Sequence, residues 1–212
     1  IASAGGMSTE DAITTVRKRG ILMQNAVPGG KGTMAAVLGM KGVDIEKVVD
    51  SIDGVTIANY NCPGQLVVAG LKSSLGGFIE DVAANGGKAV PLKVSGGFHS
   101  PFMESASIRL AEVLGGMDVK APQVPVYANY TAEPYTAQTA KELLVKQVSN
   151  PVRWQQTVEK LLEDGVDTFI EVGAGKTLCG LIKRMSRTAK IYNVEDAASL
   201  AAAVAAVREE NA

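Results

Sequence analysis

An ordered alternation of strand-like and helix-like segments fills most of this chain and limits the folds open to it. Between residues 33 and 94 the expected order is strand 33–40, helix 43–52, strand 55–61, strand 65–71, helix 72–86 and strand 88–94. This β-α-β-β-α-β order is that of the ferredoxin-like split motif, and its central turn carries Asn, Pro and Gly, as a hairpin turn should. We therefore predict a ferredoxin-like subdomain over residues 32–94.

The segments on either side of this subdomain alternate in the same way. An amphipathic helix is expected over residues 9–27, with Ser8 and Asp11 as a capping-box-like start and Pro28-Gly29-Gly30 as its stop. Alternation of helices and strands predicts a parallel sheet covered by helices, so the class is α/β and the larger domain comprises residues 1–31 and 95–212. Its later elements are expected at helix 102–114, strand 124–129, helices 137–148 and 152–163, strand 167–173, helix 176–185, strand 190–194 and helix 196–210.

The composition excludes several classes of protein. A net charge of −1 argues against a nucleic-acid binder, and no apolar run is long enough for a membrane span. Cys62 and Cys179 do not form a disulfide framework and are expected to be reduced thiols. The first residues lack the pattern of a secretory signal, so we expect a cytoplasmic protein.

Arg19 is the first residue that could carry chemistry. Ala12, Val16, Arg19 and Met23 follow one another at helical spacing, which puts the guanidinium on the apolar stripe of the helix. A desolvated arginine must be paired or must bind an anion, because an unpaired buried charge is costly. The spacing alone leaves two interpretations open: an ion pair or snorkelling at the edge of the stripe, and a site for an anionic ligand.

His99 is the only histidine in the chain. It follows Gly96-Gly97-Phe98 and precedes Ser100-Pro101, where a strand gives way to a helix and α/β folds place their chemistry. Histidine is the usual general base near neutral pH, and the paired glycines let another backbone or a ligand come close. A structural role for a lone histidine is the alternative. Metal binding is not expected, because there is no second histidine.

Two further features do not predict a catalytic site. The segment EVGAGKTL (171–178) lacks the first glycine of a phosphate-binding loop, because Ile170 stands there, and is better explained as a strand, a glycine turn and a helix start. Cys62 and Cys179 lack the electropositive surroundings of a reactive thiol, so both are expected to be structural.

Taken together, five segments resemble the malonyl-CoA:acyl-carrier-protein transacylases of fatty acid synthesis and the related acyltransferase domains of polyketide synthases. They occur in the family's order and with about its spacing over nearly the whole chain. The segments are VRKRGILMQNAVPGGKGTMAAVLG (16–39), NYNCPGQLVVAG (59–70), GGFHSPFM (96–103), VKQVSNPVRW (145–154) and EVGAGKTL (171–178).

The resemblance implies an α/β-hydrolase-like core with an inserted ferredoxin-like subdomain, and ping-pong acyl transfer through an acyl-serine. His99 matches the histidine that deprotonates the serine and reprotonates the departing thiol. Gln147 matches the residue whose backbone carbonyl accepts the other imidazole N–H, as the aspartate does in a catalytic triad. Arg19 matches the arginine that binds the malonyl carboxylate, which favours the ligand interpretation of this residue.

The resemblance also implies the substrate contacts. Phe98 is the residue type associated with malonyl rather than branched acyl groups, Asn61 matches a position near the pantetheine arm, and Met23 is a further substrate-binding residue. The implied substrates are malonyl-CoA and phosphopantetheinyl acyl carrier protein, with no cofactor and no metal. The acidic carrier protein could meet the basic residues Lys183, Arg184, Arg187 and Lys190, which could equally form a solvated helix face.

The chain departs from the family in one respect. The family's nucleophile lies on a Gly-His-Ser-x-Gly elbow, and this motif does not occur among the 212 residues. We therefore expect a missing N-terminal segment of the same protein to supply the serine and the oxyanion hole, and we expect this chain alone to be inactive. The alternatives are an acyltransferase of polyketide synthesis, a non-catalytic module that binds malonyl groups or carrier protein, and a hydrolase that uses Cys62 or Cys179.

Overall fold

The computed structural model describes residues 1–27 and 30–210 and divides into two compact units, Ile1–Thr157 and Val158–Ala212, each described here by itself. The class is mixed α/β, as predicted. The predicted helix stop at Pro28-Gly29 lies outside the described residues.

A five-stranded sheet with two covering helices forms one part of the first unit. The six elements predicted over residues 33–94 are present in the predicted order. The sheet order is β4-β1-β3-β2-β5; the pairs β1–β3, β1–β4 and β2–β3 are antiparallel, and β5 is parallel to β2. The elements are β1 (Gly32–Leu38), α2 (Gly42–Asp50), β2 (Val55–Cys62), β3 (Gln65–Leu71), α3 (Lys72–Ala84), β4 (Lys88–Pro91) and β5 (Val152–Arg153).

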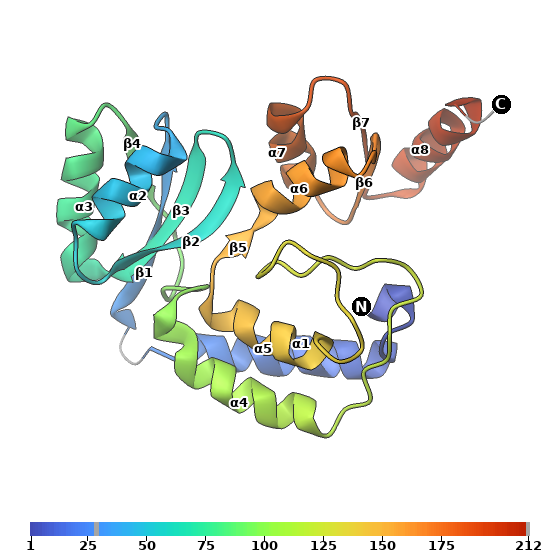
Figure 1. Cartoon of the computed structure of the whole chain (residues 1–212), viewed down its shortest axis with the longest axis horizontal. Coiled ribbons are helices and arrows are strands. Elements are labelled where there is room, and N and C mark those ends of the chain that lie inside the picture. The colour runs from blue at the N-terminus through green and yellow to red at the C-terminus, as the bar shows by residue number, and fades with distance from the viewer. Residues whose placement is uncertain (28–29, 211–212) are drawn as a thin grey trace. The chain divides into compact units, whose positions relative to one another are not determined.

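The two faces of this sheet are buried differently. Helices α2 and α3 cover one face (Figure 1), and Ile45, Val68 and Phe78 are fully buried between the helices and the strands. A smaller apolar cluster that includes Met34 and Ala69 occupies the opposite face, where Phe98 packs against it. The second face is therefore the one that meets the segment carrying His99.

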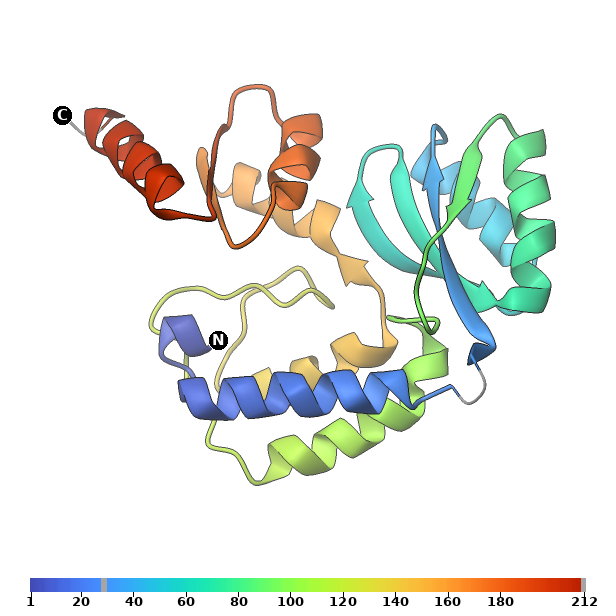
Figure 2. The same ribbon diagram turned by 180° about the vertical axis from the view of Figure 1, so that it is seen from behind.

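Three helices form the other part of the first unit: α1 (Thr9–Gln24), α4 (Glu104–Gly115) and α5 (Ala140–Ser149). They lie side by side in both views (Figures 1 and 2), with short 3-10 helices at Ala2–Ala4 and Pro101–Met103. Their shared core includes Met103, Leu110 and Val148, and Phe98 also packs against it. The predicted start of α1 is confirmed, because the Ser8 hydroxyl accepts a hydrogen bond from the Asp11 N–H at 3.0 Å.

The predicted apolar stripe of α1 is only partly correct. Met23 is buried and Arg19 is half-buried, but Val16 is 68% exposed, so its assignment to the buried stripe was wrong. The helix instead buries Thr15 and Leu22. Apolar residues are present on both sides of this helix, so helical spacing alone does not fix which side faces the core.

The strand predicted over residues 124–129 is wrong. Within the described part of the chain, this segment makes a single isolated bridge, between Tyr127 and Pro134. Hydrogen bonds from Ala128 N–H to the Glu133 carbonyl and from Tyr135 N–H to the Val126 carbonyl fold it back on itself instead, each at 2.8 Å. An apolar segment forms a strand only where a partner strand runs beside it, and here the neighbouring backbone is a turn.

The second unit is built around a parallel pair of strands, as predicted. Strand β6 (Thr168–Val172) pairs with β7 (Lys190–Val194) over their whole lengths, joined by α7 (Thr177–Met185) and followed by α8 (Ala197–Glu210). Helix α6 (Trp154–Glu163) spans the junction between the two units along the chain.

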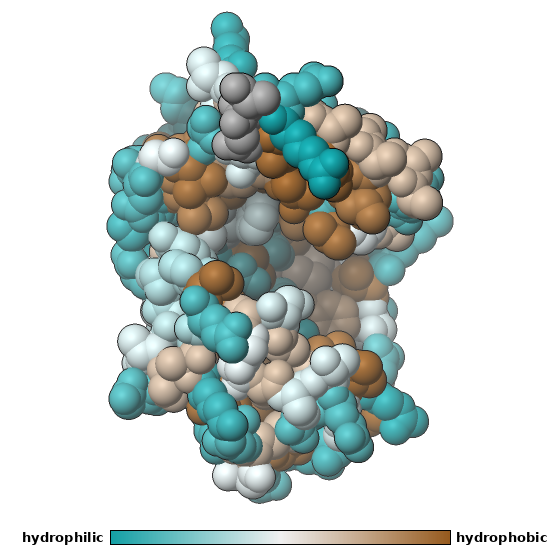
Figure 3. Space-filling model, turned by 90° about the vertical axis from the view of Figure 1, so that its right-hand side faces the viewer, coloured by the Kyte–Doolittle hydropathy of each residue, from teal (hydrophilic) through white to brown (hydrophobic). Residues whose placement is uncertain are grey.

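Apolar side chains remain exposed on this second unit. Ile170 and Val172 on β6, and Leu200 and Val204 on α8, are exposed, and Val172 is exposed to 79%. Figure 3 shows apolar side chains gathered on the face of this unit that is turned toward the viewer. Over residues 1–27 and 30–210, no helix is both long enough and apolar enough to cross a membrane.

Candidate active site

Helix α1 presents the Arg19 side chain at its partly buried edge. Among the residues that the structure describes, no carboxylate oxygen lies within 4.0 Å of its guanidinium. Burial lowers the pKa of Arg19 below its ordinary value, and the neighbouring Tyr135 acts in the opposite direction. A half-buried cation without a protein anion is the arrangement that an anionic ligand stabilises.

The loop before Pro101 holds His99 in an uncommon backbone conformation. His99 has a φ of 55°, in the left-handed region that side chains other than glycine rarely adopt. The loop is fixed by close packing of two backbones: a Cβ on Gly32 would lie 2.6 Å from the Gly97 nitrogen. The first residue of β1 therefore sets the position of the segment that carries Phe98 and His99.

The imidazole of His99 is oriented by a backbone carbonyl. Its Nδ1 lies 2.9 Å from the carbonyl oxygen of Gln147, so Nδ1 must carry the proton and donate it. In the neutral ring, the lone pair then lies on Nε2, which is the atom available to accept a proton. No carboxylate is needed for this orientation.

Gln147 can accept this bond because of the residue one turn further on. In a continuing helix its carbonyl would accept a bond from the N–H of residue 151, but Pro151 has no N–H. Helix α5 also ends at Ser149. The carbonyl therefore remains unused within the helix and is directed at His99.

Burial controls the pKa of His99. Desolvation lowers it below the ordinary value of 6.5, the backbone hydrogen bonds with Gln147 and Asn150 act to raise it, and the positive charge of Arg19 lowers it. The net shift is downward, so the imidazole is neutral at pH 7 and can act as a base.

A cavity of about 370 Å³ contains both of these groups. It brings together the predicted residues Arg19, Met23, Phe98 and His99, whereas Gln147 contributes through its carbonyl bond to His99. Asn61 is not among the lining residues and lies at an irregularity in the pairing of β2 with β3. Its predicted role stays a prediction. The complete lining is Arg19, Gly20, Met23, Met34, Phe98 and His99.

Two residues near this cavity were not predicted from the sequence. Met34 enters the lining from β1, on the sheet face opposite α2 and α3. Its place in the alternation of strand residues, out of phase with the core positions Ala35 and Val37, could have indicated this. Tyr135 does not line the cavity. Its hydroxyl accepts a hydrogen bond from the Gln147 side chain, and it lies in a loop without sequence periodicity.

Other nucleophilic side chains are buried. Ser100 follows His99 directly, but it is fully buried and its hydroxyl donates to the Gly97 carbonyl. Cys62 and Cys179 are 1% and 6% exposed, and burial raises the pKa of the Cys179 thiol. A buried thiol with a raised pKa is a poor nucleophile.

The glycine turn of residues 171–178 already contains its own anion. The Glu171 carboxylate accepts hydrogen bonds from the N–H groups of Leu178 and Cys179, at 3.1 and 2.8 Å, at the start of α7. A helix N-terminus that holds a protein carboxylate is satisfied without a phosphate. Within the described ranges, no group of three or more His, Cys, Asp and Glu side chains is arranged to hold a metal ion.

Comparison with known proteins places the chain in a family. The sequence matches the acyl transferase domain family over residues 1–209. A malonyl CoA-acyl carrier protein transacylase of Bacillus subtilis (strain 168) is 43% identical over 217 residues, covering 100% of this chain and 68% of the relative. One from Staphylococcus aureus (strain MRSA252) is 38% identical and covers 92% of this chain and 65% of the relative.

Two solved structures extend the comparison. The malonyl CoA-acyl carrier protein transacylase of Clostridium perfringens superposes with a TM-score of 0.96 at 36% identity, covering 100% of this chain and 68% of that one. A malonyl-transacylase in complex with a type II polyketide synthase acyl-carrier protein gives 0.91 at 38% identity, covering 94% and 66%. The chain thus spans about two thirds of the length of these relatives. On this evidence the chain belongs to the acyl transferase domain family and, within it, to the malonyl CoA-acyl carrier protein transacylases.

Proposed function

We propose that the protein carrying this chain transfers the malonyl group of malonyl-CoA to the pantetheine thiol of acyl carrier protein, in fatty acid synthesis. One observation carries the proposal. Arg19, a half-buried cation with no carboxylate near it among the described residues, lines the same cavity as His99, a neutral base whose Nδ1–H is held by a carbonyl. The arrangement suits a substrate with a carboxylate at one end and a reacting thioester at the other.

The proposed chemistry is a ping-pong exchange through an acyl-serine. His99 Nε2 takes the proton of the serine hydroxyl as its oxygen attacks the thioester carbon; the C–S bond breaks, and the thiolate of coenzyme A takes that proton from Nε2. In the second half, Nε2 accepts the proton of the pantetheine thiol, whose sulfur attacks the acyl-serine ester, and the serine oxygen recovers the proton. Arg19 binds the malonyl carboxylate throughout with its planar guanidinium.

The serine itself is proposed to lie outside these 212 residues. The family's elbow requires Gly-His-Ser, the only histidine here is preceded by Phe98, and Ser100 is buried with its hydroxyl bonded to Gly97. We therefore propose that this chain alone does not catalyse malonyl transfer and that an N-terminal segment supplies the serine and the oxyanion hole. The reaction written in this way uses no cofactor or metal.

The shape of the cavity supports selection of the acyl group. Phe98 lies beside His99, with Met23 and Met34 in the same lining. A ring at this position leaves little room for an α-methyl group, which favours malonyl over branched extenders. Asn61 is proposed to lie near the pantetheine arm.

The carrier protein is the proposed partner. One solved relative is a malonyl-transacylase in complex with an acyl-carrier protein of a type II polyketide synthase, which supports this partner and makes polyketide synthesis the second candidate pathway. Lys183, Arg184, Arg187 and Lys190 are exposed and would attract an acidic protein. The proposed compartment is the cytoplasm.

We also propose a division of the fold. Residues 1–31 and 95–212 would form an incomplete α/β-hydrolase-like core, and residues 32–94 a ferredoxin-like subdomain. The β-α-β-β-α-β order and the antiparallel sheet order β4-β1-β3-β2 support the second assignment. The parallel pairing of β6 with β7 supports the first.

The test is transfer of labelled malonyl from malonyl-CoA to acyl carrier protein by the protein with its serine elbow present. We expect label on the carrier protein, none with His99→Ala, and none with the 212-residue chain alone. Absence of transfer by the elbow-containing protein would overturn the proposal. Tight binding of malonyl-CoA or carrier protein by the chain alone, with no transfer by either form, would instead favour the non-catalytic binding module.

A further inference from the structure

Gln147 makes hydrogen bonds through both its backbone carbonyl and its side-chain amide. Its carbonyl oxygen accepts the bond from His99 Nδ1–H at 2.9 Å, and its side-chain Nε2–H donates to the hydroxyl oxygen of Tyr135 at 3.2 Å. The two contacts lie on one residue in the last turn of α5. A change at the side-chain end is therefore passed to the carbonyl end through a single residue.

Tyr135 is itself fixed before α5 begins. Its backbone N–H donates to the Val126 carbonyl at 2.8 Å. The next residue, Thr136, exchanges hydrogen bonds with Thr139: each backbone N–H donates to the other residue's hydroxyl, at 3.0 and 3.2 Å. The phenol ring thus starts from an anchored stretch of chain and reaches a residue about two turns into α5.

The last turn of α5 needs such an anchor. Beyond Gln147 the helix has lost its regular bonds, because Pro151 offers no N–H and Asn150 is extended, with φ −129° and ψ 158°. The direction of the Gln147 carbonyl is then set by the helix on one side and by the side-chain contacts of that turn on the other. The Tyr135 hydroxyl is the side-chain contact that Gln147 makes.

We propose that Tyr135 is a positioning residue for His99: its hydroxyl holds the Gln147 side chain, which keeps the Gln147 carbonyl aligned with His99 Nδ1–H. The inference rests on the proposed role of His99 as the base. It adds to that role a residue that touches neither substrate nor imidazole.

The charged groups around His99 are few. Arg19 from α1 is the one whose charge acts on it, and the backbones of Gln147 and Asn150 supply the hydrogen bonds. Burial raises the pKa of Tyr135, whereas the bond with Gln147 and the charge of Arg19 lower it, so the hydroxyl stays neutral near pH 7. A change at Tyr135 therefore reaches His99 by alignment and not by the loss of a charge.

The single histidine makes the experiment direct. In the 212-residue chain, labelled with ¹⁵N-histidine, every imidazole resonance belongs to His99, and no nucleophile is needed for the measurement. With Tyr135→Phe, which removes only the hydroxyl, we expect the His99 pKa to fall further, by about half a pH unit, and the Nδ1 proton to exchange faster with water.

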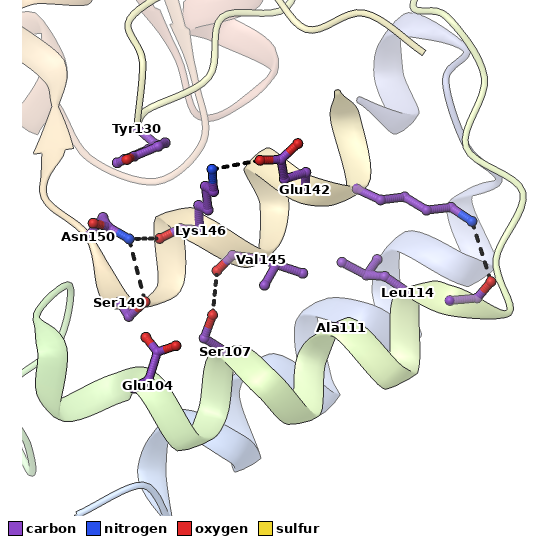
Figure 4. A pocket seen from close by; sticks show the side chains of 12 residues that line it. Glu104, Ser107, Ala111, Leu114, Tyr130, Glu142, Val145, Lys146, Ser149 and Asn150 are labelled. Atoms are coloured by element: carbon purple, nitrogen blue, oxygen red, sulfur yellow. Dashed lines mark hydrogen bonds and ion pairs between the residues drawn. The ribbon is translucent and has the colours of Figure 1, made fainter. Parts of the chain in front are cut away.

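Tyr130→Phe is the matched control. Tyr130 has Lys146 directed toward its ring and lines a separate cavity of about 530 Å³ between α4 and α5 (Figure 4). This second substitution also removes one tyrosine hydroxyl near α5, but that hydroxyl is not the one bonded to Gln147, and Gln147 does not line the Tyr130 cavity. We expect it to leave the His99 resonances unchanged.

Gln147→Ala keeps the carbonyl and removes the side chain, so it should shift His99 as Tyr135→Phe does. The double variant should shift it no further, since both changes break one link. Unchanged His99 resonances in Tyr135→Phe, an equal shift in Tyr130→Phe, or additive shifts in the double variant would each overturn the proposal. If Tyr135→Phe unfolds, the Gln147→Ala variant tests the proposal: a shifted His99 pKa supports it, and an unshifted His99 pKa overturns it. If the chain shows these shifts but the elbow-containing protein transfers no malonyl, the proposed function is overturned, whereas the positioning role of Tyr135 stands.

Discussion

Gln147 and Pro151 lie one helical turn apart, and the missing N–H of the proline leaves the Gln147 carbonyl free to accept the His99 Nδ1–H bond at 2.9 Å. In a serine triad a carboxylate does this orienting work. Here a helix end does it, with a neutral acceptor whose direction is fixed by backbone geometry. Within the described part of the chain, the imidazole is therefore oriented without a buried carboxylate beside it.

The first prediction follows from this pair. Pro151→Ala restores an N–H that can compete for the Gln147 carbonyl, so the bond to His99 weakens. We expect kcat of the elbow-containing protein to fall about two- to tenfold, the worth of one ordinary hydrogen bond. Steady-state kinetics with malonyl-CoA and carrier protein measure it. Pro125→Ala, in an exposed loop, is the control, and equal losses in both variants would contradict the competition.

Arg19→Ala separates charged from uncharged acyl groups. We expect kcat/KM for malonyl-CoA to fall about 10- to 100-fold, the worth of a charge-assisted hydrogen bond, while transfer from acetyl-CoA is unchanged or improved. Arg19→Lys should recover only part of the loss, because an ammonium cannot bind a carboxylate in two places. Arg17→Ala, on the exposed side of α1, is the control. Equal loss for both acyl groups would rule out the carboxylate-binding role.

The lowered pKa of His99 predicts the acid limb of the pH profile. Since the neutral imidazole is the proposed base, kcat/KM should fall only as the pH drops below the ordinary value of 6.5. The free energy of unfolding is expected to change with pH in the same direction as kcat/KM. The unfolded chain binds this proton first, so folding stability rises with pH through the window below 6.5. An acid limb centred above pH 6.5 in the pH dependence of kcat/KM would show that burial does not control the pKa of His99.

Gly32→Ala tests the close approach of the two backbones. Its Cβ would meet the Gly97 nitrogen at 2.6 Å, so we expect a loss of about 1–3 kcal/mol in the free energy of unfolding and lower activity. Gly77→Ala is the control: it lies inside α3 with no atom within 4 Å of the added methyl, and should stabilise by about 0.5–1 kcal/mol. Urea denaturation measures both. An unchanged free energy of unfolding in Gly32→Ala would contradict this expectation, because it would mean that the loop before Pro101 moves aside without loss of stability.

Charge reversal tests the proposed carrier-protein surface. Lys183→Glu with Arg187→Glu should weaken the apparent affinity for the acidic carrier protein several-fold at low salt, and less at high salt, because exposed charges are screened. Binding titrations at two ionic strengths measure it. An affinity that is the same as for the unaltered protein at both would assign these residues to a solvated helix face.

Much of the fold could be predicted from periodicity and turn residues. The strand at 190–194 and the strand at 65–71 match the observed β7 and β3, because short runs rich in aliphatic, β-branched and aromatic residues are local signals. The exposed side of α1 was predicted less well. Val16 belongs to a second apolar row of that helix, and the packing that decides between the rows is not local.

The candidate site divides in the same way. Arg19 and His99 could be singled out, since a cation on an apolar stripe and a lone histidine after two glycines are unusual positions. Met34 could have been indicated only by its place in the strand alternation, and Tyr135 could not be predicted, because its contact with Gln147 joins a loop to a later helix. The strand expected at 124–129 failed for a related reason, since a strand depends on the partner beside it.

The walls of the cavity come from three separate stretches of chain: helix α1, strand β1 and the loop that carries Phe98 and His99. Met34 enters from the first strand of the sheet, whereas Arg19, Phe98 and His99 lie outside that sheet. Met34, which would shape the proposed acyl pocket from the sheet side, can thus vary without a change at Arg19 or His99. A chimera that exchanges residues 32–94 between relatives of different acyl preference, keeping Gly32, would alter selectivity while leaving proton transfer intact.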